Sequence, residues 1–139
     1  PHITVQWGLR DDRVGPIRYA VQGITPVAFA LGLTAVFNTP EADVLYVSVT
    51  SPGLDGLRRK IQRATEHIVE HHAYTPHVTI AYLAPGSATP YVGQDTFVGL
   101  RGVIDRFVHC SREGIQSPVR FAPTASVTSP KGPNPRTRF

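Results

Sequence analysis

The sequence predicts an α+β domain in which antiparallel sheets carry one main helix packed on a sheet. Strand-like segments lie on both sides of a single clear amphipathic helix. A short strand motif also occurs twice, first as Pro1-His2-Ile3-Thr4-Val5 and then as Pro76-His77-Val78-Thr79-Ile80. This internal echo predicts two similar lobes, each of which supplies one motif strand.

The first part of the chain has the pattern of strands separated by turns. Residues 2–9 alternate in the manner of a short strand, and residues 17–21, which follow a loop, are predicted to form a helical turn. Residues 27–37 are apolar and predict a strand that the turn residues at 38–40 end. Residues 44–50 are the strongest strand prediction in the chain because β-branched and aromatic residues dominate them.

The clearest helix begins at Ser51, with this serine placed as the N-cap and Pro52 at the first helical position. Its predicted buried stripe consists of Leu54, Leu57, Ile61, Ala64 and Ile68. The basic residues that lie mostly away from the stripe are Arg58, Arg59, Lys60 and Arg63. They are interpreted first as a solvated face and second as a patch that attracts phosphate. Residues 74–76 are predicted to break the helix.

The remaining chain predicts strands again. Residues 77–83 alternate as a strand that Pro85 and Gly86 end. Further strands are predicted at 96–100, 102–110 and 118–121. From residue 125 the composition shifts to Thr, Ser, Pro, Lys and Gly, which cannot build a core. The domain is therefore predicted to span residues 1–124, with a Pro-rich tail at 125–139.

Length and composition limit the class of protein. The chain has 139 residues, of which 41% are hydrophobic and 17% charged, as expected for one globular domain. No apolar run approaches the roughly 18 residues of a membrane-spanning helix, and the start lacks the features of a signal peptide. The net charge of +4 and the pI of about 9.7 suit an anionic partner such as nucleic acid or a nucleotide. Charge by itself slightly favours a solvated basic surface.

The single cysteine, Cys110, excludes an internal disulfide and a zinc site of four thiolates. Its position in an apolar run predicts a small core residue rather than a nucleophile. A reducing environment fits these features, so we expect a cytoplasmic protein.

The two motif segments place histidine beside threonine in the same way. Residues i and i+2 of a strand point to the same side, so His2 and Thr4 share one face, as do His77 and Thr79. The alternate apolar residues, Ile3, Val5, Val78 and Ile80, are predicted to face a core. If the two strands lie side by side, two imidazoles and two hydroxyls converge on one place.

This set of groups suits the cleavage of a phosphodiester. Histidine titrates near neutral pH, so one imidazole can take a proton from water or a ribose hydroxyl while the other protonates the departing oxygen. The threonine hydroxyls can donate hydrogen bonds to the non-bridging phosphate oxygens. The scheme requires no metal and no cofactor, and it leaves open which histidine is the acid.

Chance accounts poorly for the repeat. With 6 His in the chain, about 0.6 His-x-Thr triplets are expected at random, and roughly 0.1 when both alternate positions must be apolar. The alternative, in which both histidines are ordinary strand residues, is therefore the less favoured interpretation.

The two motifs, their separation, and the strand and helix between them resemble the 2H phosphoesterase superfamily. This superfamily includes the LigT-type 2′-5′ RNA ligase-like proteins and cyclic nucleotide phosphodiesterases, and the likeness covers roughly residues 1–122. The tracts at 1–9 and 74–83 resemble domains encoded by bacteriophages, some of which degrade cyclic oligonucleotide signals of bacterial immunity.

The resemblance implies a bilobal fold with a cleft between the lobes. It implies His2 and His77 as the catalytic pair, with Thr4 and Thr79 as phosphate ligands. A phage-encoded member would act in the host cytoplasm.

Two other interpretations concern the remaining histidines. His67, Glu70 and His71 match the His-x-x-Glu-His pattern of inverted zinc peptidases, in which two histidines four apart on a helix could chelate a metal. The chain is small for such a peptidase, and the dipole at a helix C-terminus favours histidines there, so we prefer a helix-end role. His72 is predicted to pack on the apolar stripe, and His109 to be a structural strand residue.

Aromatic residues near the motifs could stack on a nucleobase. Trp7 and Tyr82 follow their motifs at similar offsets and Tyr74 precedes the second motif, so these three are candidate substrate-binding residues. Packing is an equally good interpretation for Trp7 and Tyr82, and the better one for Tyr46. No arginine is singled out as a substrate clamp.

The main hypothesis is a metal-independent phosphodiesterase that cleaves a cyclic oligonucleotide messenger, a 2′-5′ linkage or a 2′,3′-cyclic phosphate. The phage-like flanks favour the cyclic messenger and a counter-defence role. A module that binds a nucleotide or an RNA end without turnover is the rival, and a domain appended to a phage virion protein is a third option. We expect neither a membrane nor an obligatory protein partner.

Overall fold

The computed structural model describes residues 1–69 and 73–121, and it confirms the predicted α+β fold. In chain order the elements are α1 (Gly15–Val21), β1 (Val27–Asn38), β2 (Asp43–Thr50), α2 (Pro52–Ala64), β3 (His77–Leu83), the short 3-10 helix η1 (Thr89–Tyr91), β4 (Arg101–Ile104), β5 (Arg106–Cys110) and β6 (Gln116–Arg120). The strands predicted at 27–37, 44–50 and 77–83 and the helical turn predicted at 17–21 are thus confirmed.

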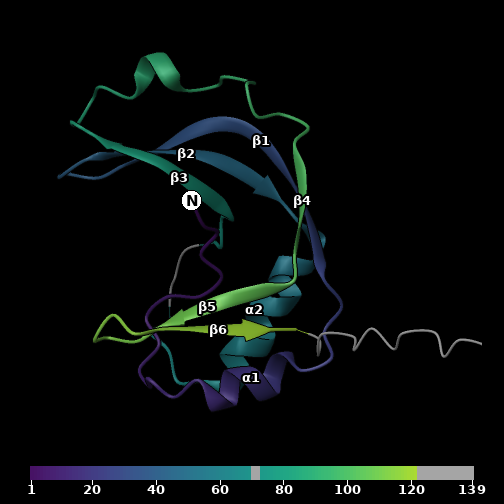
Figure 1. Ribbon diagram of the computed structural model, residues 1–139. Coiled ribbons are helices and arrows are strands. Elements are labelled where there is room, and N and C mark those ends of the chain that lie inside the picture. Colours follow the sequence, from purple (N-terminus) through teal and green to yellow (C-terminus); the bar gives the residue numbers. More distant parts are fainter. Residues whose placement is uncertain (70–72, 122–139) are drawn as a thin grey trace, which may run out of the picture.

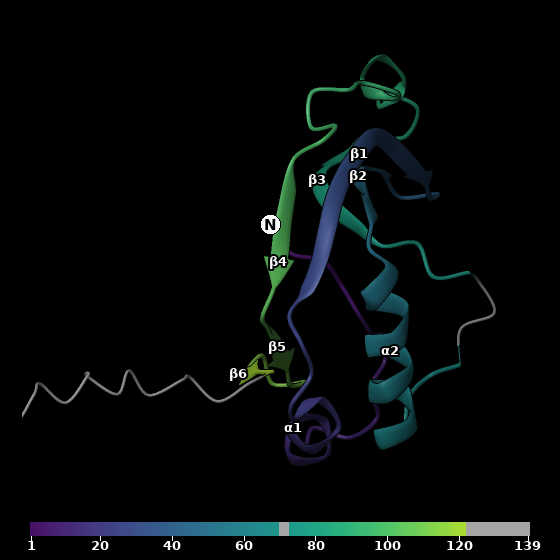
Figure 2. The same cartoon turned by 90° about the vertical axis from the view of Figure 1, so that its right-hand side faces the viewer.

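The described strands form two antiparallel sheets. The larger has the order β3-β2-β1-β4, and the smaller pairs β5 with β6 (Figure 1). The larger sheet curls over one half of the molecule, while the two helices and the smaller sheet occupy the other half (Figures 1 and 2). Within the larger sheet, the long strand β1 pairs with β2 along one stretch and with β4 along another.

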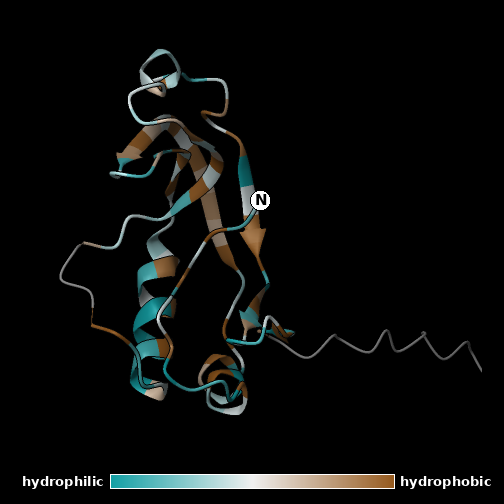
Figure 3. Ribbon diagram, turned by 90° about the vertical axis from the view of Figure 1, so that its left-hand side faces the viewer, coloured by the Kyte–Doolittle hydropathy of each residue, from teal (hydrophilic) through white to brown (hydrophobic). Residues whose placement is uncertain are grey.

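The main core lies where the helices meet the sheets. Helix α2 buries Leu54, Leu57 and Ile61 at 0%, 3% and 4% exposure, which confirms these members of the predicted stripe. They pack with Ile17 and Val21 of α1 in one cluster. Burial of such a side chain stabilises a fold by about 1.5–3 kcal/mol. The solvent side of α2 is mostly hydrophilic (Figure 3).

The end of α2 differs from the prediction. The helix ends at Ala64, so Ile68 lies beyond it and is exposed. Thr65 has an extended backbone, and its hydroxyl donates a 2.7 Å hydrogen bond to the carbonyl of Ile61, which satisfies a helix-end acceptor. Ser51 occupies the N-cap position, but its hydroxyl donates to the carbonyl of Ala28 in β1 instead of capping the helix.

Two strand predictions after β3 were wrong in detail. Residues 96–100 form turns, because the amides of Val98 and Leu100 donate to carbonyls three residues earlier and Gly99 has a φ of 86°. The strand predicted at 102–110 is divided at Asp105 into β4 and β5, which belong to different sheets. The last strand is confirmed as β6, although it begins at Gln116.

The predicted strand at residues 2–9 does not form as a regular element. This segment meets the rest of the fold through isolated bridges, Ile3 with Val78 and Leu9 with His67. After the first bridge the chain leaves the sheet and runs toward α1 (Figure 3). The expected burial of its apolar residues is still found, since Ile3 and Val5 pack against the core.

The prediction of a buried Cys110 was wrong. Cys110 is exposed, whereas the preceding His109 is buried at 5% exposure. Because side chains alternate along a strand, β5 can bury one of these neighbours and must then expose the other.

The predicted tail at 125–139 lies outside the described residues, and the domain boundary at 124 remains a prediction. Within residues 1–69 and 73–121, neither α-helix has the length and apolar character needed to cross a bilayer.

Candidate functional site

The two His-x-Thr motifs lie next to each other. Ile3 and Val78 form an antiparallel bridge, and both side chains pack against the core. Opposed residues of an antiparallel pair point to the same face, so a register continued by one step on each side of this isolated bridge would pair Thr4 with His77 and His2 with Thr79. Both pairs would then be on the face away from the core. The structure thus brings the motif segments together from distant parts of the chain.

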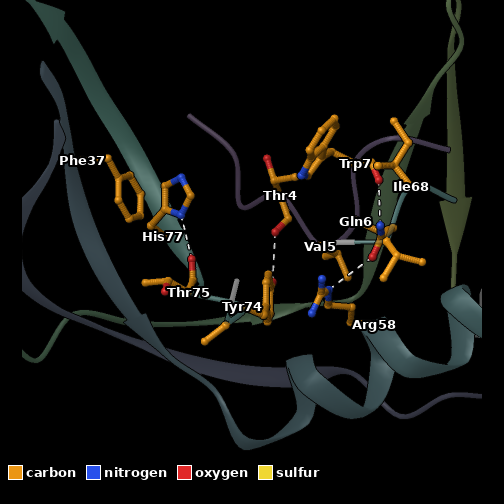
Figure 4. Close-up of a pocket in the computed structure, with 12 residues that line it drawn as sticks. Thr4, Val5, Gln6, Trp7, Phe37, Arg58, Ile68, Tyr74, Thr75 and His77 are labelled. Carbon is orange, nitrogen blue, oxygen red and sulfur yellow. Dashed lines mark hydrogen bonds between the residues drawn. The ribbon is translucent and has the colours of Figure 1, made fainter. Parts of the chain in front are cut away.

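A pocket of about 520 Å³ lies beside the motifs (Figure 4). The residues that line it are Thr4, Val5, Gln6, Trp7, Phe37, Arg58, Ile68, Val69, Ala73, Tyr74, Thr75 and His77. One histidine and one threonine of the predicted site are among them. His2 and Thr79 are not; His2 is exposed and Thr79 is half-buried.

The imidazole of His77 is fixed by its own chain. Its Nδ1 lies 2.8 Å from the backbone carbonyl oxygen of Thr75 (Figure 4). A carbonyl oxygen can only accept, so Nδ1 carries the proton and donates it. In the neutral ring Nε2 then holds the lone pair. His77 is therefore prepared to accept a proton at Nε2.

Two aromatic rings pack against the same imidazole. The centroids of Phe37 and Tyr46 lie 5.0 Å and 5.1 Å from that of His77, and the two rings stack on each other at 4.2 Å. Tyr46 is 8% exposed, which confirms the packing interpretation of this residue. The contacts hold the imidazole on one side, so its orientation is set by β1 and β2 as well as by β3.

A second cluster holds the segment that carries the first motif. The hydroxyl of Tyr74 donates a 2.9 Å hydrogen bond to the backbone carbonyl of Thr4. Gln6 accepts at Oε1 from Nε of Arg58, at 3.2 Å, and from Nε2 of Gln62, at 2.9 Å. The guanidinium carbon of Arg58 lies 4.7 Å from the centroid of the Tyr74 ring. Arg58 therefore contacts Tyr74, which bonds Thr4, and Gln6, which belongs to the first segment itself.

Sequence reasoning missed the role of Arg58, which was grouped with the solvated face of α2. Its side chain is half-buried and lines the pocket, whereas Arg59 is exposed and pairs with Asp55. The sequence feature that could have revealed this role is the spacing of Arg58, which follows Leu54 by four residues and precedes Ile61 by three. This spacing places Arg58 at the border of the buried stripe of α2.

Burial raises the pKa of Tyr74 to about 12, and the nearby Arg58 offsets only part of this increase. The hydroxyl consequently stays protonated, and able to donate to Thr4, through the pH range in which histidine chemistry operates.

The other aromatic candidates differ in position. Trp7 lines the pocket and is 55% exposed, so its ring is accessible from solvent. Tyr82 is 74% exposed and is not among the lining residues. A substrate-binding role for either residue remains a prediction.

Of the other described histidines, His67 and His109 do not line this pocket. His67 lies after the end of α2, where its Nδ1 donates to the carbonyl of Thr65, so the helical geometry assumed for zinc chelation is absent at His67. Glu70, His71 and His72 lie outside the described residues. His109 is buried in β5, and within the described part of the chain its Nε2 has no hydrogen-bond partner.

Comparison with known proteins gives one match. A family model described as the 2′-5′ RNA ligase superfamily matches residues 1–107, which include both motifs and the helix between them. No curated protein and no solved structure matches the chain significantly.

Proposed function

Because the chain belongs to the 2′-5′ RNA ligase superfamily, the LigT-like 2H phosphoesterases, we propose that it is a phosphodiesterase that cleaves a nucleotide phosphodiester without a metal ion. The observation that carries this proposal is the pairing of the motif segments through Ile3 and Val78, with Thr4 and His77 lining one pocket. The net charge of +4 suits an anionic substrate.

His77 acts as the base in the first step. Its Nδ1–H is occupied by the carbonyl of Thr75, so Nε2 can remove a proton from the attacking oxygen of water or of a ribose hydroxyl. That oxygen forms a bond to phosphorus, and the bond from phosphorus to the departing oxygen breaks. His2 donates the proton that the departing oxygen needs. The hydroxyls of Thr4 and Thr79 donate hydrogen bonds to the non-bridging oxygens.

The pocket suggests how the nucleoside part of the substrate binds. A volume of about 520 Å³ lies within the usual range for small-molecule sites and exceeds what a phosphate group needs. Its lining is largely apolar and includes Trp7 and Phe37. We assign it to the nucleobase and sugar next to the scissile phosphate, with Trp7 as the accessible stacking surface.

The test is turnover of a substrate panel in EDTA: cyclic oligonucleotides, 2′-5′-linked dinucleotides and 2′,3′-cyclic nucleotides. We expect cleavage of at least one class, with a bell-shaped pH–rate profile. His2→Gln and His77→Gln should each lower the rate by about 10² to 10⁴. His67→Gln is the matched control, because His67 lies outside the pocket.

Complete loss of activity in EDTA would contradict the mechanism, as would full activity in either motif variant. Tight binding of a nucleotide without any product would instead support the rival function, a module that captures nucleotides or RNA ends. Cleavage restricted to cyclic oligonucleotides would favour the counter-defence role.

A further inference from the structure

The first motif segment needs ties beyond its own backbone. Its pairing with β3 is a single bridge at Ile3, whereas the proposed reaction requires His2 and Thr4 to keep a fixed position opposite His77. One hydrogen-bonded position cannot fix the direction of a chain segment, because the segment can still rotate about it. The next backbone ties of the segment lie at its far end, where Leu9 bridges His67 and the amide of Ile68 donates to the carbonyl of Gly8. Between these two anchors, the side-chain contacts of the segment decide where Thr4 points.

Tyr74 supplies one of these contacts. Its hydroxyl bonds the carbonyl of Thr4, the residue directly after the bridge. Tyr74 is also three residues before His77 on the same chain segment, so it connects the two motifs through a short path. Figure 4 shows the tyrosine ring below Thr4, between His77 and Arg58.

The ring of Tyr74 also lines the pocket, but its contacts favour a positioning role over a stacking one. One face of the ring is covered by the guanidinium of Arg58, at 4.7 Å from the centroid. Its hydroxyl is bonded to Thr4, and the residue as a whole is half-buried. An aromatic platform for a nucleobase needs an accessible face, which Trp7 offers at 55% exposure.

We propose that Tyr74 is a positioning residue, which fixes the first motif segment opposite His77 through its hydrogen bond to Thr4, and is not a base-stacking residue. Arg58 supports this role through two contacts. Its guanidinium packs on one face of the Tyr74 ring, and its Nε donates a hydrogen bond to Gln6 of the first motif segment. This inference rests on the proposed function for its effect on the rate, but its structural part can be measured without a substrate.

The decisive variant is Tyr74→Phe in the full chain, which keeps the ring and its contact with Arg58 but removes the hydroxyl. We expect kcat to fall about 10- to 100-fold with KM changed less than about threefold, because small misplacements of catalytic groups have effects of this size. Amide hydrogen exchange of residues 3–7 should become faster. Tyr19→Phe is the control, since Tyr19 is 83% exposed on α1.

Tyr74→Leu, which also removes the ring, separates positioning from stacking. A stacking role predicts a normal kcat in Tyr74→Phe and a raised KM in Tyr74→Leu, and that result would overturn the inference. Unchanged kcat and unchanged exchange in Tyr74→Phe would overturn it as well. If the unmodified chain cleaves no phosphodiester, the proposed function fails, and the exchange measurement still decides whether Tyr74 fixes the segment.

Discussion

The two motifs have nearly the same sequence but are held by different parts of the fold. The second motif begins β3, which is paired with β2 at six positions, from Ser48 with His77 to Asp43 with Leu83. The first motif is paired with β3 through the bridge of Ile3 to Val78. One half of the candidate site is thus part of a sheet. The other half lies between two isolated bridges, at Ile3 and at Leu9, and is tied between them by the side chains of Tyr74 and Gln6.

This difference shows what a strand pattern specifies. Alternation of apolar and polar residues predicts which side chains face the core, and it is right for Ile3 and Val5 of the first motif and for Val78 of the second. It is wrong for Ile80, which is 46% exposed, because the register between β2 and β3 shifts at this point. The number of backbone pairs depends on how the chain continues. The segment after the first motif leaves the sheet for α1, whereas β3 continues along β2 to Leu83. A site with one weakly paired half needs additional contacts to be preorganised.

The largest expected contrast is in stability. Val78→Ala should lower the free energy of unfolding by about 1–2 kcal/mol, because Val78 is paired within the sheet and the space left by its side chain cannot be relieved without disrupting the sheet. Ile3→Ala should cost less than about 1 kcal/mol, even though it removes more atoms, since the first segment can detach before the fold unfolds. Urea unfolding of both variants measures the difference. Equal or reversed costs would show that the first segment belongs to the same cooperative unit.

A smaller effect is expected where the second motif meets its aromatic support. Phe37→Leu removes the ring contacts with Tyr46 and His77 and should lower the free energy of unfolding by about 1 kcal/mol. The rate of the proposed phosphodiester cleavage should also fall under conditions in which the variant is fully folded, because the imidazole of His77 loses the ring that packs against one side of it. Thermal unfolding and single-turnover rates check this, and a rate equal to that of the unmodified protein would contradict it.

The contacts around the two motifs should lose their contribution to stability at opposite ends of the pH range, those of Tyr74 at alkaline pH and those of Asp43 at acid pH. Tyr74 has its pKa raised by burial to about 12, so its contribution is present below about pH 10 and is lost as the pH rises toward 12. Asp43, at the start of β2, has its pKa lowered by hydrogen bonds from the amide of Ala88 and from Asn38. Its contribution is present above its unfolded pKa, about 3.8, and is lost as the pH falls through the lower native value.

Variants at these two residues separate the regions. In a plot of unfolding free energy against pH, Tyr74→Phe should make the decrease between about pH 10 and 12 less steep and leave the decrease at acid pH, the acid limb, unchanged. Asp43→Asn should flatten the acid limb below about pH 4 and leave the alkaline limb unchanged. Urea unfolding across the pH range gives both limbs. The same limb changing in both variants would show that the two residues do not act on separate regions.

Much of the fold could be predicted because its signals are local. The period of apolar residues located β1, β2 and β3 and the buried side of α2, where Leu54, Leu57 and Ile61 point inward. The same reasoning failed where a choice depended on distant partners. Thr65 ends α2 with a bond to its own last turn, and Asp105 divides one predicted strand between two sheets.

The candidate site shows the same division. The sequence by itself determined the two His-x-Thr motifs and the face on which each presents its polar groups, because strand alternation is a property of neighbouring residues. Only the tertiary structure decided that Phe37 supports His77, that Arg58 belongs to the pocket, and that Tyr74 bonds the first motif. These contacts join residues 40 to 70 positions apart or lie at the edge of a helix face, so they depend on how the elements pack, which no local pattern encodes.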